Sequence, residues 1–354
     1  MTIKSGTIHL LILAGLTVFL SGFFCKQADS SKSPQNEVAK NLEFSFAFDQ
    51  KAAAKDLEVM TTTPHPFGSE AQKTIHDFFI ERLTQIGLDA KSLPFESETP
   101  NPILLTEPQK MAPLTITKKG YNIFARAIQG SQACVILIGT HYDTKTIDNG
   151  EYLGANDSGS STVGLLHLLK NLKDQADRLG DLKCSIAGLF IDGEEAQLPN
   201  WNDGIQKHPA KIIDNRYGSR DFANKLKPCD AGAHCLESNL GEEHVKAFLL
   251  MDMIGSKNLT LTLDTHSDQS LKQLALRIDD ELFESKLIHR GREIPIEDDH
   301  ISFIEVGVPA IDLIDFANIS TWHQPGDTLD TISYESISNV VHLTTVMALE
   351  LSQN

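Results

Sequence analysis

Clusters of basic residues are missing from this chain of 354 residues, which has 31 Lys and Arg against 48 Asp and Glu and a formal net charge of −17. Nucleic-acid binding depends on clustered Lys and Arg that neutralise phosphates, so the composition argues against such a partner. The sequence shows no internal repeat, and 41% of its residues are hydrophobic, enough for one large core. We therefore expect one folded domain.

Long apolar runs are confined to the N-terminus, where residues 10–24 read LLILAGLTVFLSGFF. Because a membrane-spanning helix takes about 20 apolar residues, this shorter run is typical of a signal peptide. Cys25 follows directly, as in bacterial lipoprotein signals, although Phe24 replaces the small residue usual there. We expect a signal peptide over 1–24, a polar tether over 25–41 and a catalytic domain over 42–354. Export to a bacterial periplasm or cell envelope follows, with Cys25 as a candidate lipid anchor and the only expected membrane contact.

Cysteine is scarce, with five residues in the chain. Cys229 and Cys235, in CDAGAHC, have a spacing that could close a small disulfide loop in an exported protein. A zinc knuckle that includes His234 is the alternative, but a set of four ligands is not in view. Cys134 and Cys184 lie in apolar, strand-like runs, and we expect them to be buried thiols.

Helix-like and strand-like apolar patterns alternate along the chain. Helical spacing of apolar residues predicts helices over 44–62, 71–88, 160–179 and 271–285. Strands are predicted over 121–128, 133–139, 184–192, 246–255 and 308–314, and an irregular segment over 197–215. Because the strands are apolar on both faces, we expect a single-domain α/β fold with a mostly parallel, mixed central sheet and helices on both faces.

Potential metal ligands follow the predicted strands, where each strand ends. The stretch 190–196, FIDGEEA, places three acids directly after one predicted strand. The motifs THYD and MDM stand at the ends of two other predicted strands. In such sheets, ligands bind beyond the carboxyl ends of the strands. The residues that we expect to meet there are His141, Asp143, Asp192, Glu194, Glu195 and Asp252.

Asp157 and His323 complete this candidate site. Taken alone, Asp157 in GANDSGSS could be a helix cap and His323 a surface residue. Together with the strand-end acids, they provide the nitrogen and carboxylate ligands of a catalytic zinc site, which uses three protein ligands and leaves one position open. Of the neighbours Glu194 and Glu195, one can then bind metal while the other acts as general base and acid. Asp192 is expected to support the site through hydrogen bonds.

The ordered motifs HYD, GANDSGSS, DGEEA, LLMDMIG and WHQPGDTLD resemble the zinc-dependent aminopeptidases of peptidase family M28. Several stretches are more similar to glutaminyl cyclases: HYDTK, FIDGEEAQLPNW, YGSRDFA, EDDHISFIEVGVP and TWH. The resemblance covers about residues 45–354 and implies an α/β/α sandwich with glutaminyl-peptide cyclotransferase activity, a form of acyl transfer. Such enzymes convert the N-terminal glutamine of peptides or proteins into pyroglutamate and release ammonia.

The resemblance also implies roles for individual residues. Asp157, Glu195 and His323 would hold one zinc ion, which polarises the γ-carbonyl of the substrate. Glu194 would move a proton from the α-amine of the substrate to the departing amide nitrogen.

A pair of acids is implied beside the substrate amide. Asp298, the first acid of DDH, would lie against Asp252 and bind the γ-amide, and carboxylates in contact would share a proton. Aminopeptidases of this family bind two metals, and His141 with Asp252 could complete a second site here. A second zinc ion stays open, and a two-metal aminopeptidase is the alternative function.

Tryptophan occurs only twice, as Trp201 and Trp322. An isolated Trp is more often a core residue. Both positions nevertheless match those where the cyclases place aromatic walls around the glutamine side chain, whereas the aminopeptidases usually have Tyr before the late histidine. The two tryptophans therefore favour a cyclase.

The chain departs from the animal cyclases at several positions. Glu297 stands where they have glutamine, and Thr140 and Thr162 stand at the positions of their active-site disulfide. The segment between 309 and 322 differs in length, so it assigns no pocket aromatic. These departures bear on substrate preference and on the rigidity of the site.

A catalytically silent binding protein that holds peptide N-termini is a third interpretation. The intact Glu194 argues against it, because binding alone needs no proton shuttle. Peptide or protein N-termini are the expected partners in every case. We expect a monomer, since no exposed heptad or long edge strand is evident.

Overall fold

The computed structural model describes residues 44–103, 111–148, 150–199, 201, 203–204, 212–229, 232–316 and 320–354. These residues belong to one compact unit, Val38–Asn354. The predicted signal peptide and tether lie outside the described residues. Within the described part of the chain, no helix is long and apolar enough to cross a membrane.

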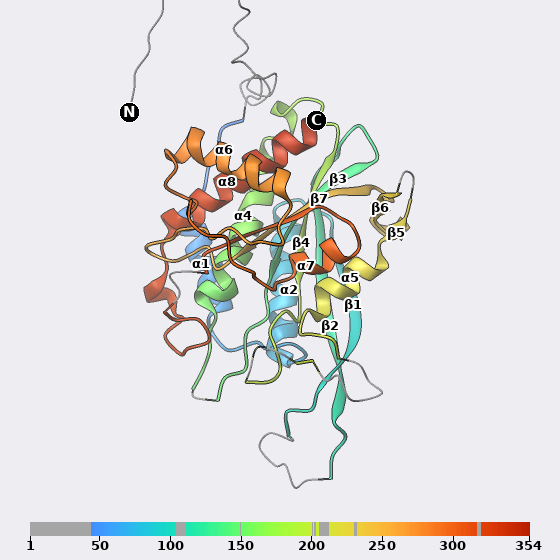
Figure 1. The fold of residues 1–354 in the computed structure, drawn as a ribbon, viewed down its shortest axis with the longest axis vertical. Coiled ribbons are helices and arrows are strands. Elements are labelled where there is room, and N and C mark those ends of the chain that lie inside the picture. Colours follow the sequence, from blue (N-terminus) through green and yellow to red (C-terminus); the bar gives the residue numbers. More distant parts are fainter. Residues whose placement is uncertain are drawn as a thin grey trace, which may run out of the picture. The chain divides into compact units, whose positions relative to one another are not determined.

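An eight-stranded sheet forms the centre of the domain (Figure 1). Its strands are β1 (Ala90–Pro100), β2 (Thr115–Ile128), β3 (Cys134–His141), β4 (Ser185–Ile191), β5 (Lys227–Pro228), β6 (His234–Cys235), β7 (His244–Asp252) and β8 (Ala310–Ile314). Their order is β1-β2-β4-β3-β7-β6-β5, and β8 also pairs with β7. The pairs β3–β4, β3–β7 and β7–β8 are parallel and the others antiparallel. The sheet is mixed, with a parallel centre.

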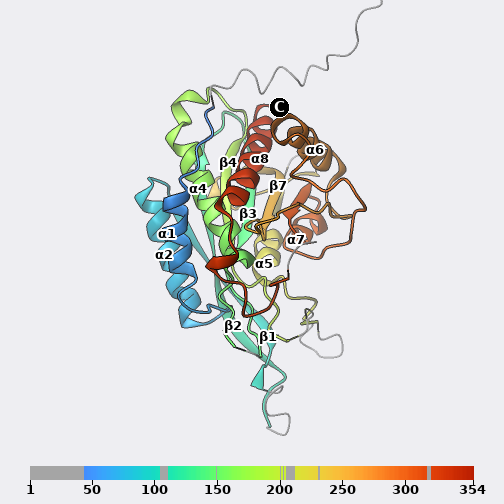
Figure 2. The same ribbon diagram turned by 90° about the vertical axis from the view of Figure 1, so that its left-hand side faces the viewer.

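Helices cover both faces of this sheet, as predicted. One face packs against α1 (Gln50–Met60), α2 (Glu70–Gln85), α4 (Ser161–Asp174), α6 (Gln269–Phe283) and α8 (Tyr334–Gln353), and the other against α5 (Tyr217–Lys225) and α7 (His300–Glu305). Successive side chains of a strand point to opposite faces. Ile136 and Ile138 of β3 therefore enter the first hydrophobic cluster, while Val135 and Leu137 enter the second. Figure 2 shows α1 and α2 on one side of the central strands and α7 on the other.

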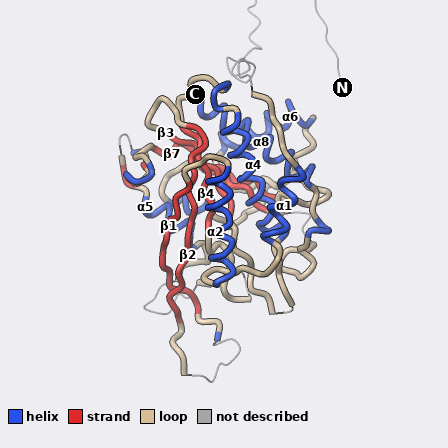
Figure 3. The backbone as a smooth tube through the Cα atoms, turned by 180° about the vertical axis from the view of Figure 1, so that it is seen from behind, coloured by secondary structure: helices blue, strands red, loops and turns tan. Residues whose placement is uncertain are grey.

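Several elements are not anticipated by the sequence patterns. Strand β1 contains Pro94 and Pro100, and it forms an edge of the sheet, paired only with β2 along its whole length (Figure 3). Proline is confined to such positions because it cannot donate to a central ladder. Helix α8 is buried over much of its circumference, so it lacks a polar stripe that would reveal its period. Helices α5 and α7 are short, with 9 and 6 residues.

The prediction that Cys134 and Cys184 are free thiols is wrong, because they form a disulfide with an S–S distance of 2.08 Å. Cys134 begins β3, and Cys184 immediately precedes β4. These parallel strands are neighbours, so their first residues lie side by side with Cα atoms 4.6 Å apart. The Cys229–Cys235 disulfide is also present, which confirms the predicted loop.

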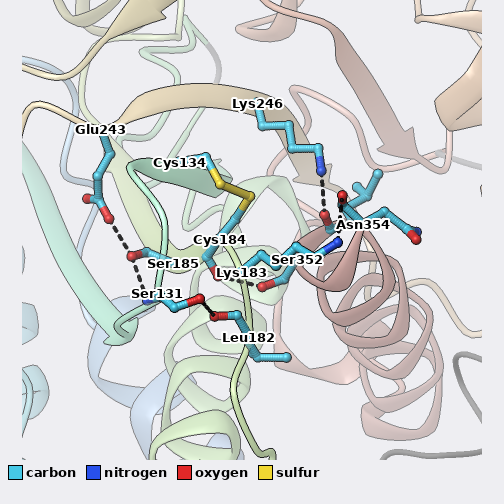
Figure 4. Close-up of a disulfide and its surroundings, with 12 residues drawn as sticks. Ser131, Cys134, Leu182, Lys183, Cys184, Ser185, Glu243, Lys246, Ser352 and Asn354 are labelled. Carbon is cyan, nitrogen blue, oxygen red and sulfur yellow. Dashed lines mark hydrogen bonds between the residues drawn. A yellow bond between two sulfur atoms is a disulfide. The ribbon is translucent and has the colours of Figure 1, made fainter.

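The C-terminal end of α8 is tied to the same corner of the sheet (Figure 4). The backbone N–H groups of Lys183 and Cys184 donate to the carbonyl oxygen of Ser352 at 2.9 and 3.0 Å, and the Ser352 hydroxyl donates back to Cys184 O at 2.5 Å. Lys246 Nζ donates to Leu351 O at 2.9 Å. These bonds and the disulfide fasten the amino ends of the parallel strands.

We expect the two disulfides to differ in their effect on stability. Cross-links restrict the unfolded chain more when they close longer loops, and the sequence separations are 50 for Cys134–Cys184 and 6 for Cys229–Cys235. Replacing both members of the first pair by Ala should lower the free energy of unfolding by about 4 kcal/mol, against about 2 kcal/mol for the second pair. Urea titrations of the two double variants measure this. Equal losses would contradict the loop-length argument.

Candidate active site

The carboxyl edge of the parallel strands gathers the predicted strand-end residues. His141 is the last residue of β3, Asp252 is the last of β7, and Asp192 directly follows β4. All three are buried, as are Glu194 and Glu195 in the loop beyond Asp192. The side chains that the sequence analysis expected to meet at this edge are therefore together in the folded domain.

Asp157, Glu195 and His323 come together into one candidate metal site, although they are far apart in the sequence. His323 Nε2 lies 3.2 Å from Glu195 Oε2 and 3.6 Å from Asp157 Oδ2. Asp157 lies in the turn η3 (Ala155–Ser160) before α4, and His323 follows β8 by nine residues. These ligand types are those of zinc sites in proteins.

Two members of this group, Glu195 and His323, have polar atoms that the protein does not satisfy, whereas both oxygens of Asp157 have hydrogen-bond partners. His323 Nε2 and both carboxylate oxygens of Glu195 have no hydrogen-bond partner among the described residues. Although His323 Nε2 and Glu195 Oε2 are only 3.2 Å apart, they are not aligned with each other for a hydrogen bond. Buried polar atoms without partners are costly, and a shared cation would satisfy all of them. The group therefore fits a metal ion.

A second group, His141, Asp157 and Asp252, shares Asp157 with the first. Here His141 Nε2 is 3.1 Å from Asp157 Oδ1, within a hydrogen bond, and 3.3 Å from Asp252 Oδ1. Asp252 Oδ1 also accepts from the backbone N–H of Met253 at 2.8 Å. Burial lowers the pKa of His141, but Asp143, Asp157 and Asp252 outweigh it and raise that pKa well above its ordinary value. The three carboxylates thus favour the charged form of His141.

The loop with Glu194 and Glu195 is held by its backbone. Their N–H groups donate to Asp143 Oδ1 and Oδ2 at 3.0 and 3.2 Å, so Asp143 positions both acids rather than joining a metal group. Asn215 Nδ2 donates to Glu194 O at 2.8 Å. The buried Lys145 donates to Ala196 O and, at 2.7 Å, to Leu198 O. Lys145 ends the HYDTK motif, but its backbone-holding role could not be read from the motif.

Asp192 makes supporting hydrogen bonds, as expected, and it is not a member of either candidate metal group found among the described residues. Its Oδ2 accepts from Gln72 Nε2 at 2.5 Å and from Tyr121 N at 2.8 Å. Its own N–H donates to Asn122 Oδ1 at 3.0 Å. Asp192 therefore joins the end of β4 to α2 and β2, and it supports the loop at its start.

Two residues beyond the predicted set orient Asp157. Tyr152 donates its hydroxyl to Asp157 Oδ2 at 2.7 Å, and Asp327 accepts from the backbone N–H of Asp157 at 3.0 Å. Gly154 has φ of 60°, and a Cβ atom there would lie 2.4 Å from Asp157 O. A glycine at this position thus allows the backbone to pass close to Asp157. Tyr152 lies outside every quoted motif, so no sequence signal marked it.

The ionisation of Glu194 is shifted by its surroundings. Burial raises the pKa of Glu194 well above its ordinary value, and the neighbouring carboxylates of Asp298 and Glu195 raise it further against an opposing effect of His141. Glu194 Oε1 has no hydrogen-bond partner among the described residues, and Glu194 lines a cavity. A buried carboxyl with a raised pKa that faces a cavity is suited to proton transfer.

Asp298 is buried near Asp252, as the resemblance implied. Burial and then the charge of Asp252 raise the pKa of Asp298 well above its ordinary value. Burial also raises the pKa of Asp252, whereas His141 opposes that rise. The pair therefore retains one proton more readily than two isolated acids.

Both tryptophans line the cavity beside these acids, which has a volume of about 400 Å³. The rings of Trp201 and Trp322 are tilted with centroids 5.7 Å apart, and the Trp322 ring stacks on His323 at 4.2 Å. Phe316, two residues after β8, meets Trp322 edge to face at 5.5 Å and also lines the cavity. The sequence assigned no aromatic to this position, because the surrounding segment differs in length from that of the animal cyclases and cannot be aligned with it residue by residue.

Thr140 and Thr162 join β3 to α4 by hydrogen bonds. Thr162 Oγ1 donates to His141 O at 2.7 Å, and Thr140 Oγ1 donates to Ser161 Oγ at 2.7 Å. Both threonines are buried. These bonds hold the end of β3 against the start of α4, at the two positions that the resemblance aligns with the active-site disulfide of the animal cyclases.

The chain is similar to known proteins in sequence and in fold. The glutaminyl-peptide cyclotransferase of Drosophila melanogaster is 24% identical over 306 residues, which cover 81% of this chain and 77% of that protein. The glutaminyl-peptide cyclotransferase of Boiga irregularis is 29% identical over 266 residues, which cover 66% and 67%. The crystal structure of an Acidobacteriales bacterium glutaminyl cyclase is similar with a TM-score of 0.68 and 25% identity, over 88% of this chain and 97% of that one. Residues 122–348 match peptidase family M28, and the chain therefore belongs to this family.

Proposed function

We propose that this protein is a zinc-dependent glutaminyl-peptide cyclotransferase, an acyltransferase that converts the N-terminal glutamine of peptides or proteins into pyroglutamate. The observation that carries the proposal is one cavity lined by Glu194, which has an unpartnered carboxylate oxygen, by the buried Asp298 and by the rings of Trp201 and Trp322. The similarity to glutaminyl-peptide cyclotransferases supports it.

Asp157, Glu195 and His323 are the residues that would hold zinc. The unsatisfied ligand atoms of Glu195 and His323 support this choice over the group around His141, whose Nε2 already has a hydrogen bond to Asp157. Bound zinc supplies Lewis-acid polarisation of the γ-carbonyl of the substrate glutamine. One ion per chain is proposed.

Glu194 acts as the proton carrier of the reaction. Its carboxylate accepts a proton from the α-amine, whose nitrogen then forms a bond to the γ-carbonyl carbon and closes the five-membered ring. Glu194 returns that proton to the γ-amide nitrogen, whose bond to carbon breaks, so ammonia leaves. The burial of Glu194 supports both halves, because a raised pKa makes the carboxylate a stronger base and its protonated form easier to populate.

Asp298 and the tryptophans bind the glutamine side chain. A carboxyl of Asp298 accepts a hydrogen bond from the γ-amide NH₂, and the proton held by the Asp252–Asp298 pair limits the repulsion between these acids. Trp201 and Trp322 pack against the methylene groups and exclude water. This restricts the substrate to a conformation in which the amine can reach the carbonyl.

A two-metal aminopeptidase is the second candidate, because the groups around His323 and His141 share Asp157, as a bridging ligand would. The satisfied Nε2 of His141 and the aromatic walls of the cavity favour the cyclase.

We further propose that the protein is exported to a bacterial periplasm or cell envelope, with Cys25 as lipid anchor, and acts as a monomer. The two disulfides support an oxidising compartment.

Incubation of a glutamine-led peptide with the purified protein tests the activity by mass spectrometry. We expect loss of one ammonia with an unchanged number of residues, and loss of this activity after treatment with a zinc chelator. Release of the free first residue would instead establish an aminopeptidase.

Glu194→Gln should lower kcat by about 10²-fold or more while zinc stays bound, because the amide keeps the shape of the side chain but cannot carry the proton. Glu58→Gln, which removes an exposed acid of α1, is the matched control and should keep its activity. Activity of Glu194→Gln close to that of the control would eliminate the proposed role.

His323→Ala should lose its zinc, because it removes one of three protein ligands. Metal analysis of the intact protein should give one zinc per chain, and the variant should give far less than one. His266→Ala, at an exposed histidine on the same cavity, is the control and should keep its zinc. Full zinc content in His323→Ala would refute the ligand assignment, and two ions per chain would favour the aminopeptidase.

A further inference from the structure

The cavity is lined by acidic side chains both in its buried part and in its solvent-exposed part. Among the described residues that line it, five are acids, and none is Lys or Arg: Asp157, Glu194, Asp252, Glu297 and Asp298. Four of these acids are buried, whereas Glu297 is exposed. Glu297 therefore lies at the solvent side of the cavity. It adds negative charge at the place where the rest of a bound peptide would extend into solvent.

Glu297 is the one of these acids whose charge the proposed chemistry does not use. Among the described residues, none forms a hydrogen bond or ion pair with the Glu297 carboxylate. The other polar side chain at the mouth, His266, lies with its Nδ1 3.1 Å from Asp264 Oδ1, and its backbone N–H also donates to Asp264. The Glu297 carboxylate is therefore available to a ligand, while His266 is held by its neighbour.

The direction in which a substrate binds follows from the buried groups. In the proposed reaction Glu194, which lines the cavity, receives the substrate amine, and Trp201 and Trp322, which also line it, surround the side chain of the first residue. The second residue must then lie toward the exposed part of the lining, which includes Pro295, Glu297 and His266.

We propose that Glu297 determines specificity for the second residue of the substrate and favours peptides in which glutamine is followed by Lys or Arg. This inference rests on the proposed cyclase function and names its substrate class. A cationic side chain at the second position forms an ion pair with the free Glu297 carboxylate, and an acidic side chain is repelled by it. The formal net charge of −17 acts in the same direction on approaching peptides.

Three peptides that differ only at the second residue, Gln-Lys, Gln-Ala and Gln-Glu, test the proposal through their kcat/KM. At low salt we expect the Lys peptide to exceed the Ala peptide by about 1.4- to 5-fold, the range of exposed ion pairs, with the Glu peptide below both. The preference should shrink in 0.5 M NaCl, since salt screens exposed charges. It should nearly vanish in Glu297→Gln and reverse in Glu297→Lys, whereas Glu58→Gln should keep it.

The outcomes separate this inference from the activity itself. If the three peptides are cyclised with the same ratio in Glu297→Gln as in the unmodified protein, Glu297 does not set the preference, and the proposed cyclase function still stands. If pyroglutamate forms from none of the three, the cyclase function fails and this inference fails with it. A preference that persists in 0.5 M NaCl would also overturn the ion pair.

Discussion

Burial of several carboxylates at one edge of a sheet is the constraint on which the rest of this site depends. An ionised carboxylate out of water is costly unless it is paired, hydrogen-bonded or bound to a cation. The fold provides partners for some of these carboxylates and not for others. Asp143 and Asp192 receive backbone and side-chain hydrogen bonds, and His141 serves Asp157 and Asp252. Glu195 and Glu194 are left with unsatisfied oxygens, and these are the groups with proposed chemical roles.

The division of labour between Glu194 and Glu195 depends on how their loop is fixed. Asp143 receives both backbone N–H groups, and Asn215 binds the carbonyl of Glu194, so the two side chains cannot exchange positions without breaking these bonds. Side chains held through the backbone stay free for metal and substrate. A catalytic pair needs this, because a metal ligand and a proton carrier must differ in environment although they are neighbours in sequence.

Stability and function occupy opposite ends of the parallel strands. The Cys134–Cys184 disulfide and the end of α8 fasten the amino ends of the strands, while the carboxyl ends present the acids. Strand geometry links the two ends, because a strand that is anchored in register delivers its last residue to a fixed place. The site can therefore hold unsatisfied groups while the opposite end supplies much of the rigidity.

The sequence by itself determined the α/β class, the helices on both faces and the identity of the residues at the carboxyl edge, because apolar periodicity and strand-end position are local properties. It did not reveal β1, whose prolines make an edge strand look like a loop, or α8, which has no polar face to mark its period. It also missed the pairing of Cys134 with Cys184 and the places of Tyr152 and Phe316. Only the tertiary structure decided these features. It also decided that Asp143 positions the loop, because every one of them depends on which strands and loops become neighbours. Contacts between residues that are far apart in sequence leave no local sequence pattern from which a single sequence could predict them.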